Sequence, residues 1–250
     1  MELSFLNGGK PAILLGMSPE TVKQALQEIA LGIDQGAEGF CIQTEELAPQ
    51  FREHQSYETI FNAVGDRPIY LTHYRLKNKC QLTEDEIART MLELADFPQV
   101  TICDVTGDQY DPQPGQLTDQ PLAVKRQMEL IDALHRKGKK VLMSSHIFRY
   151  RDGEEVLRVA LEQQARGADI VKIVTAADTM EQQLDNIRIT QMLKDELKVP
   201  FLFLTNGQCK LHRRISMMLG NCMCLCQLNG TALNQPPLAD ALAFRDHYPW

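Results

Sequence analysis

The sequence predicts a (β/α)8 barrel, in which eight parallel strands form a ring and a helix follows each strand. Short β-rich runs alternate with longer runs of helical apolar spacing along the whole chain, and eight such units fit its 250 residues. A doubly wound open sheet is the alternative. It is disfavoured because no glycine-rich phosphate loop follows the first strand, where PAILLGMSPE runs directly into a helix. No linker interrupts the pattern, so we expect one barrel domain over residues 1–250.

The first four units are apolar strand runs followed by amphipathic stretches. We expect strands at 11–17, 39–44, 68–74 and 99–105, and helices at 21–36, 56–64, 83–97 and 122–138. Thr83 with Glu86 resembles a capping box, and Ser18 before Pro19 resembles an N-cap with proline at the first helical position. The segment 106–121, rich in Pro, Gly and Asp, follows the fourth strand and belongs on the C-terminal rim, where barrels carry their active sites.

The last four units repeat the pattern. We expect strands at 140–146, 169–175, 200–206 and 222–228, and helices at 153–167, 179–197, 211–220 and 238–248. Cys222, Cys224 and Cys226 alternate along the last strand, so we expect them to share one face. We interpret them as small buried residues, because CxC on an extended strand differs from the CxxC turns typical of zinc sites.

The composition is that of an ordinary globular protein and argues against several partners. Hydrophobic residues make up 44% of the chain, and 33 Asp and Glu outnumber 26 Lys and Arg, for a net charge of -7. That charge disfavours nucleic acid and anionic membranes as partners. The apolar runs are far shorter than the roughly 20 residues of a membrane span, and the N-terminus lacks a signal peptide's order of basic then apolar residues. We expect a cytoplasmic protein whose seven cysteines are reduced thiols.

Two ionisable side chains interrupt apolar strands and are candidates for catalysis. Lys172 lies in GADIVKIVT, where alternation puts it on one face with Ile170 and Val174. If that face is the barrel interior, burial favours the neutral amine, a nucleophile for ketones and aldehydes; the alternative is an outward lysine whose head reaches solvent between helices. His146 ends the preceding, neighbouring strand. We expect the two side chains to meet at the mouth, where the imidazole moves protons beside an imine; a structural histidine is the alternative.

Several motifs, in order, resemble those of type I 3-dehydroquinate dehydratase, a barrel enzyme of the shikimate pathway. They are MSSHIF, GADIVKIV and PFLFLTNGQCKLHRRISMMLGN, with PIYLTHYR at the third strand and TGD after the fourth. The likeness runs from about Pro11 to Pro237. It implies that Lys172 forms an imine with the substrate ketone and that His146 relays the proton in a syn elimination of water. It implies a small-molecule keto-acid as substrate and neither a metal nor an organic cofactor, and it allows a homodimer.

The resemblance also assigns substrate-binding residues. Arg214 falls where the family has the arginine that grips the substrate carboxylate, and its neighbour Arg213 is a rival for that role. Phe148 matches the family's aromatic wall. Gln235 lies near the family's glutamine and Thr231 near its serine, provided one residue is deleted upstream. For the two arginines and Gln235, an ordinary surface position is the alternative.

Charges that the family carries are missing at two strands. On the second strand, Cys41 and Gln43 stand where the family has a carboxylate and an arginine. On the fourth strand, Cys103 takes the gapless place of the glutamate that orients the histidine, and Asp104 replaces it only if the strand shifts by one residue. Arg75 matches the family's arginine after the third strand only with one extra residue.

Three functions remain open for a pocket that keeps its lysine and histidine and loses these charges. The first is a divergent dehydratase acting on 3-dehydroquinate or a related keto-acid. The second is a class I aldolase-like lyase, because a lysine on the sixth strand also serves that chemistry. The third is a catalytically silent barrel that binds a metabolite. Loss of both charges on the second strand favours a repurposed pocket over decay, because a single remaining buried charge would be costly.

Overall fold

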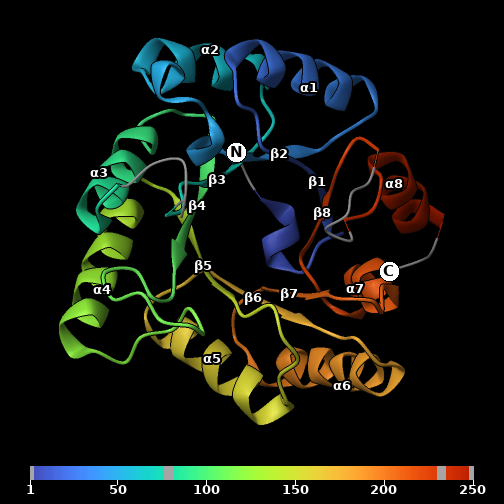
Figure 1. The fold of residues 1–250 in the computed structure, drawn as a ribbon. Coiled ribbons are helices and arrows are strands. Elements are labelled where there is room, and N and C mark those ends of the chain that lie inside the picture. The colour runs from blue at the N-terminus through green and yellow to red at the C-terminus, as the bar shows by residue number, and fades with distance from the viewer. Residues whose placement is uncertain (1–2, 76–81, 230–234, 248–250) are drawn as a thin grey trace.

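The computed structural model describes residues 3–75, 82–229 and 235–247 and confirms the (β/α)8 barrel (Figure 1). The strands are β1 (Ala12–Met17), β2 (Gly39–Gln43), β3 (Ile69–Thr72), β4 (Val100–Thr106), β5 (Lys140–His146), β6 (Ile170–Ala176), β7 (Phe201–Asn206) and β8 (Met223–Cys226). The helices are α1 (Val22–Asp34), α2 (His54–Ala63), α3 (Glu84–Leu94), α4 (Pro121–Arg136), α5 (Gly153–Ala165), α6 (Met180–Glu196), α7 (Leu211–Leu219) and α8 (Leu238–His247). Strands and helices alternate as the sequence predicts.

The Asn221 side chain helps to close the ring of strands between β7 and β8. Neighbouring strands pair in parallel in the order β7-β6-β5-β4-β3-β2-β1-β8. Between β7 and β8, the Asn221 amide accepts from the Phe203 N–H at 2.9 Å and donates to the Phe203 carbonyl at 2.9 Å. The Cys222 N–H donates to the Phe201 carbonyl at 3.0 Å. Asn221 therefore supplies the donor and acceptor that a strand residue would provide at this junction.

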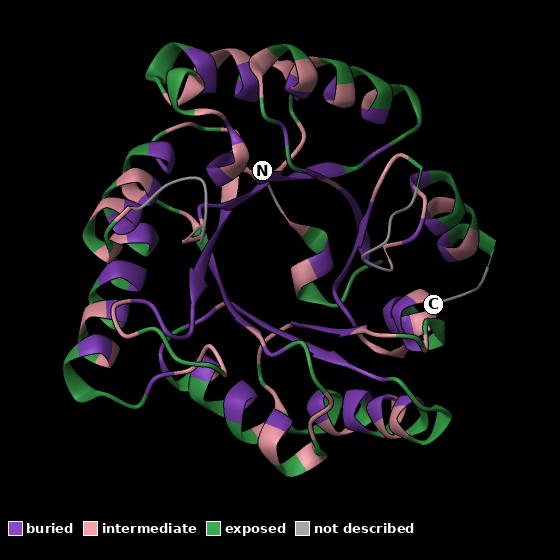
Figure 2. Cartoon of the chain, viewed as in Figure 1, coloured by how far each residue is buried: buried purple, intermediate pink, exposed green. Residues whose placement is uncertain are grey.

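Each strand divides its side chains between the barrel interior and the surrounding helices. On β6, Ile170 and Val174 belong to the interior cluster, whereas Val171 and Ile173 pack outward with residues of α5 and α6. Figure 2 shows buried residues along the ring of strands and exposed residues on the outer sides of the helices. No helix in the described part of the chain is long and apolar enough to cross a membrane.

A short 3-10 helix, η1 (Ser4–Asn7), fills the N-terminal end of the barrel. Its buried Phe5 belongs to the interior cluster, and Figure 1 shows the helix inside the ring. Ala12 and Met223, the first residues of β1 and β8, belong to the same cluster. The opposite end, at the strand C-termini, is thus the end open to a ligand.

Helix starts follow the expected chemistry at α3 but not at α1. The Thr83 side chain accepts from the Glu86 N–H, and the Glu86 carboxylate accepts from the Thr83 N–H, which is the expected capping box. The expected N-cap at Ser18 is wrong, because Thr21 caps α1. Ser18 instead donates a hydrogen bond to Gln43 Oε1 at the end of β2.

The cysteines of the last unit do not all share a face. Cys224 and Cys226 pack among the outer core residues, whereas Cys222 precedes β8 and packs with the interior cluster. The expected shared face therefore holds for two of the three. All three are buried free thiols, and burial raises the pKa of each.

Candidate active site

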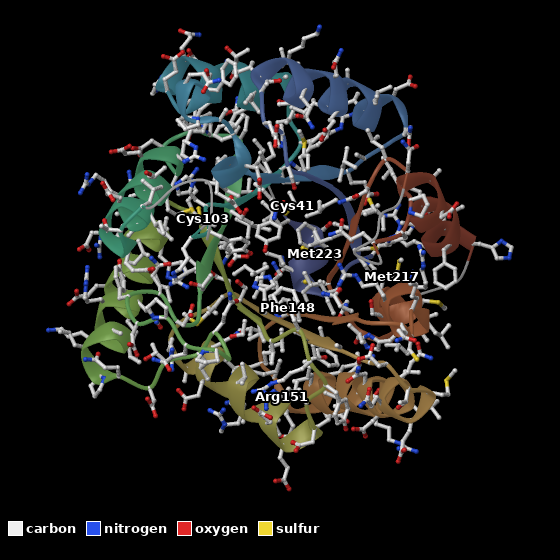
Figure 3. The ribbon with its side chains drawn as sticks, in the orientation of Figure 1. Cys41, Cys103, Phe148, Arg151, Met217 and Met223 are labelled. Atoms are coloured by element: carbon white, nitrogen blue, oxygen red, sulfur yellow. The ribbon has the colours of Figure 1, made fainter. Side chains whose placement is uncertain are left out.

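A cavity of about 380 Å³ lies at the C-terminal ends of the strands. Its lining combines cationic, acidic, amide and aromatic side chains. Among them are Cys41, Gln43, Glu45, Tyr74, Arg75, Gln116, His146, Phe148, Lys172, Arg213 and Gln235. In Figure 3, Cys41 and Phe148 lie nearer the centre of the ring than Cys103 does. The site thus occupies the rim that barrels use for catalysis.

Lys172 enters the cavity from β6 and is held by three oxygen atoms. Its Nζ lies 2.9 Å from the Tyr70 hydroxyl, 3.0 Å from the Tyr74 hydroxyl and 3.3 Å from Asp104 Oδ2. The side chain is buried, with 5% of the residue exposed. The outward position considered from the sequence is therefore wrong. The surroundings are also more polar than the sequence indicates, because Asp104 supplies a counter-ion.

Asp104, and not Cys103, faces the interior from β4. The pairing of β3 with β4 shifts register by one residue, since Ile69 pairs with Val100 while the next residue, Tyr70, pairs with Ile102. This irregularity gives β4 the one-residue shift that Asp104 needs. The gapless assignment to Cys103 is thus wrong.

The environments of the two β4 residues differ accordingly. Cys103 packs in the outer core, and burial raises its thiol pKa to about 12. Asp104 Oδ2 accepts from Tyr70 and Tyr74, and Oδ1 accepts from Ser144 Oγ at 2.6 Å. Asp104 therefore pairs with Lys172, and the contacts it makes do not include His146, the residue it was expected to orient.

His146 is oriented instead by Gln116, from the loop between β4 and α4. Gln116 Oε1 accepts the His146 backbone N–H at 2.7 Å and lies 2.8 Å from His146 Nδ1. The backbone N–H of His146 can only donate, so the Gln116 atom that it meets must be the amide oxygen. Because this oxygen can only accept, His146 Nδ1 carries a hydrogen, and Nε2 is the basic nitrogen. Burial is the main cause that holds the pKa of His146 well below its usual value, and the positive charges of Lys172 and Arg213 lower it further. The imidazole is therefore neutral at pH 7 and able to accept a proton.

Buried polar contacts hold the Gln116 loop in place. Ser145 Oγ donates to the Gln116 carbonyl at 2.6 Å, and Gln163 Nε2 donates to Ser145 Oγ at 3.0 Å. Arg166 donates to the Thr118 carbonyl at 2.6 Å. These contacts keep Gln116 in a left-handed backbone conformation, with φ at 47°, which non-glycine residues rarely adopt. A fixed loop conformation is what aims the Gln116 amide at the histidine.

Arg213, rather than Arg214, points into the cavity from α7. Arg213 is buried with 5% exposed, and its Nη1 has no hydrogen-bond partner in the described part of the chain. Burial lowers the pKa of Arg213 to about 10. Arg214 is half-buried and is not among the described residues that line the cavity. The expectation that Arg214 faces the site is thus corrected to Arg213, because one helical position turns the side chain by about 100°.

The remaining expected residues sit around the same cavity. Gln235 lines it with a buried Oε1 that has no partner among the described residues. Phe148, 63% exposed, stacks on His146 with ring centres 5.9 Å apart. Cys41 and Gln43 both line the wall, and burial raises the pKa of Cys41 to about 12, so it is a neutral thiol. Thr231 lies outside the described residues.

Arg75 reaches the rim of the cavity but already has anionic partners. Its Nε lies 2.5 Å from Glu84 Oε1, and its Nη1 lies 3.3 Å from Asp108 Oδ1. These two carboxylates offset the guanidinium charge. Arg75 is therefore less suited than Arg213 to bind an anionic ligand.

Glu45 is a buried carboxyl in the cavity wall that no sequence pattern indicates. Its two oxygens lie 3.1 and 3.0 Å from Thr72 Oγ1. Burial raises the pKa of Glu45 to about 8 against the opposing effect of hydrogen bonds. It is therefore mostly neutral at pH 7. In the sequence it stands in TEE beside Glu46 and looks like part of a solvated acidic pair, so no local signal identifies it.

The structure offers no metal centre among the residues it describes. In 3–75, 82–229 and 235–247, no group of three or more His, Cys, Asp or Glu side chains is placed to hold a metal ion. Among the groups that line the cavity are an amine, an imidazole, a guanidinium and hydroxyls. This set suits imine chemistry on a small carbonyl compound that carries a carboxylate.

Comparisons with known proteins show similarity to type I 3-dehydroquinate dehydratases. The sequence model described as type I 3-dehydroquinase matches residues 114–244. A 3-dehydroquinate dehydratase of Alkaliphilus oremlandii is 28% identical over 159 residues, which cover 60% of this chain and 56% of that protein. The aligned part thus spans little more than half of the curated relative's length.

Solved structures share the fold over nearly the whole chain. A 3-dehydroquinate dehydratase from Geobacillus kaustophilus has a TM-score of 0.81 at 17% identity, covering 97% of this chain and 92% of its own. A type I 3-dehydroquinate dehydratase from Clostridium difficile, crystallised with covalently modified comenic acid, has a TM-score of 0.83 at 15% identity, covering 97% and 94%. At these identities the likeness is one of fold alone.

Proposed function

The chain belongs to the type I 3-dehydroquinase family, and we propose that it is a Schiff-base-forming hydro-lyase acting on 3-dehydroquinate or a related cyclic keto-acid. Family membership rests on the sequence model that matches residues 114–244, about half of the chain. The observation that carries the activity is the meeting of Lys172, His146 and Arg213 in one cavity at the strand C-termini. Each group has a separate task in such a reaction.

In the proposed reaction, the Lys172 amine attacks the substrate ketone and expels its oxygen as water, which leaves an iminium ion. This positive nitrogen draws electrons from the neighbouring carbon and acidifies its proton. His146 Nε2 takes that proton, and the electron pair left on the carbon forms the enamine. The nitrogen lone pair then re-forms the iminium, the electrons of the enamine double bond form a new C=C bond with the next carbon, and the hydroxyl group on that carbon is expelled. The imidazolium returns its proton to the departing hydroxyl, so water leaves. Hydrolysis of the remaining imine frees the product and Lys172.

Arg213 binds the substrate carboxylate in this proposal. Its guanidinium is buried, lines the cavity, and has an unpartnered Nη1 in the described structure. A carboxylate would satisfy that donor with a charge-assisted hydrogen bond. Phe148 then covers the ligand beside His146, and Gln43 and Gln235 offer amides to its hydroxyl groups.

Borohydride trapping tests the proposal directly. The enzyme is incubated with 3-dehydroquinate or another keto-acid, the imine is reduced, and the modified peptide is identified by mass. A substrate-dependent adduct on Lys172, with formation of a product that has lost one water, is expected. Lys172→Met should abolish the adduct. His146→Ala should keep the adduct and stop turnover. A wild-type protein that forms no adduct with any keto-acid would overturn the proposal.

A class I aldolase-like lyase is the second candidate, and the polar shell of Lys172 favours it. Asp104 and two tyrosine hydroxyls surround the amine, and Cys41 stands where the family carries a charge. Such a shell can support protonation steps at an imine without the charges that hold a polyol ring. The products separate the two reactions, because an aldolase splits a carbon–carbon bond into two fragments and a dehydratase loses only water.

A further inference from the structure

We infer that Tyr74 is a catalytic residue in its own right, the hydroxyl that carries protons from Lys172 and Asp104 to the carbonyl oxygen while the imine forms. This inference rests on the proposed imine chemistry and concerns the step before the one assigned to His146. It assigns the site two separate proton pathways. One serves the making and breaking of the imine, and the other serves the carbon beside it.

The position of Tyr74 carries the inference. Its hydroxyl donates to Asp104 Oδ2 and accepts from Lys172 Nζ at 3.0 Å. The same side chain lines the cavity, and its ring meets the His146 ring edge-on with centres 5.4 Å apart. Tyr74 therefore touches the nucleophile, its counter-ion and the space in which the substrate must sit.

Tyr70 makes the same polar contacts from behind the site. Its hydroxyl donates to Asp104 Oδ2 and lies 2.9 Å from Lys172 Nζ. It is fully buried and is not among the described residues that line the cavity. The chain thus contains two tyrosines with matching bonds to the ion pair, of which only Tyr74 reaches the ligand space. This pair provides a control for the experiment.

The proton balance shows why a relay is needed. An ammonium group has three protons and the iminium nitrogen keeps one, so two protons must leave nitrogen and end on the departing oxygen as water. Asp104 Oδ2, 3.3 Å from Nζ, accepts the first proton and frees the lone pair for attack. The attack turns the carbonyl oxygen into an alkoxide, which faces the cavity and not Asp104.

Tyr74 can carry the proton from Asp104 to the alkoxide by reversing the direction of its hydrogen bonds. Once Asp104 is protonated, it donates to the Tyr74 oxygen, and the Tyr74 hydroxyl donates its own proton to the alkoxide. The second nitrogen proton follows the same route from Lys172 through Asp104 and Tyr74 to the hydroxyl group. The carbon–oxygen bond then breaks, water leaves, and the nitrogen lone pair forms the C=N bond. No proton is gained or lost overall, and Asp104 and Tyr74 return to their starting states while Lys172 becomes the iminium.

Rapid-quench borohydride trapping with 3-dehydroquinate measures this step apart from turnover. Tyr74→Phe keeps the ring and removes only the hydroxyl. It should slow formation of the Lys172 adduct about 100-fold, the lower range for a lost acid–base group. Tyr70→Phe should slow it at most about tenfold, the effect of one lost hydrogen bond. The solvent deuterium isotope effect on adduct formation should be present in the wild type and in Tyr70→Phe and absent in Tyr74→Phe.

A second measurement separates the two proton pathways. Once the imine has formed, exchange of the proton beside it with deuterated solvent should keep its wild-type rate in Tyr74→Phe and be lost in His146→Ala. The adduct yield of Tyr74→Phe at long times should reach the wild-type level, which shows that its site is folded. Equal slowing by Tyr70→Phe and Tyr74→Phe, or full-speed trapping in Tyr74→Phe, would overturn the relay alone. Absence of any adduct in the wild type would overturn the imine chemistry together with the relay.

Discussion

Gln116→Glu tests whether the amide of Gln116 sets the protonation of His146. In the native protein an uncharged oxygen lies 2.8 Å from His146 Nδ1, and burial with two nearby cations holds the histidine pKa well below its usual value. A glutamate at this position keeps the acceptor and adds a negative charge. That charge stabilises the imidazolium, so the pKa of His146 should rise.

The size of the shift follows from the geometry. Charge centres about 4 Å apart attract by about 4 kcal/mol at an effective dielectric constant of 20. One pH unit corresponds to about 1.4 kcal/mol, and desolvation of the new carboxylate offsets part of the attraction. We therefore expect the pKa of His146 to rise by about 1–2 units. The acid limb of the kcat/KM profile should move to higher pH by the same amount, because the base is active only when unprotonated.

The assay is the rate of product formation from pH 5 to 9, with Gln116→Met as the matched control. The methionine removes the acceptor without adding charge, so it should lower kcat while leaving the acid limb at low pH. Lys172 trapping should be unaffected in both variants, which confirms an intact nucleophile. An unchanged acid limb in Gln116→Glu would refute the assignment of Gln116 as the group that orients and tunes His146.

Three further predictions concern binding and stability. Arg213→Met should weaken keto-acid binding about tenfold to 100-fold in calorimetry, the effect of one charge-assisted hydrogen bond, whereas Arg214→Met should leave it nearly unchanged. Asn221→Ala should lower the free energy of unfolding by about 2–4 kcal/mol in urea titrations, because it orphans the buried N–H and carbonyl of Phe203; equal stability would contradict the closing role. Glu45 has a folded-state pKa of about 8, above its unfolded value, so the folded state binds the extra proton between about pH 4.5 and 8. The free energy of unfolding should therefore fall as the pH rises through that window, by at most about 1.4 kcal/mol per pH unit. Glu45→Gln should remove this dependence on pH.

The barrel was predictable because its signal is repeated and cooperative. On every strand, apolar side chains alternate or run continuously, and a parallel sheet covered by helices requires that pattern. Lys172 was identifiable as a candidate for the same reason, since a lysine between β-branched residues interrupts an apolar strand. His146 followed from its place at the end of the neighbouring strand. These inferences use only periodicity and strand order, which the sequence carries directly.

The wrong predictions concern residues whose orientation depends on a one-residue shift in a strand, on one position in a helix or on the conformation of a loop. A one-residue irregularity in β4 brings Asp104 inward and Cys103 outward, and the letters TICDVTGD carry no mark of it. Arg213 and Arg214 differ only by the phase of α7, which packing sets. Gln116 acts through a loop whose left-handed backbone is held by distant contacts. Register, helix phase and loop shape are tertiary properties, so local sequence patterns do not determine them.

The charges that remain in the cavity indicate which ligands it accepts. Asp104 offsets the charge of Lys172, the pKa values of Glu45 and His146 leave both mostly neutral at pH 7, and Arg213 keeps a buried donor without a partner among the described residues. Glu46 and Arg75 also line the cavity, and Arg213 presents a buried positive charge to the ligand space. A monocarboxylate cancels it, whereas a dicarboxylate adds an unpaired buried negative charge and a neutral ketone leaves Arg213 unpaired. The site should therefore discriminate by ligand charge before it discriminates by ring shape, and a screen for its substrate should begin with keto-acids that carry a single carboxylate.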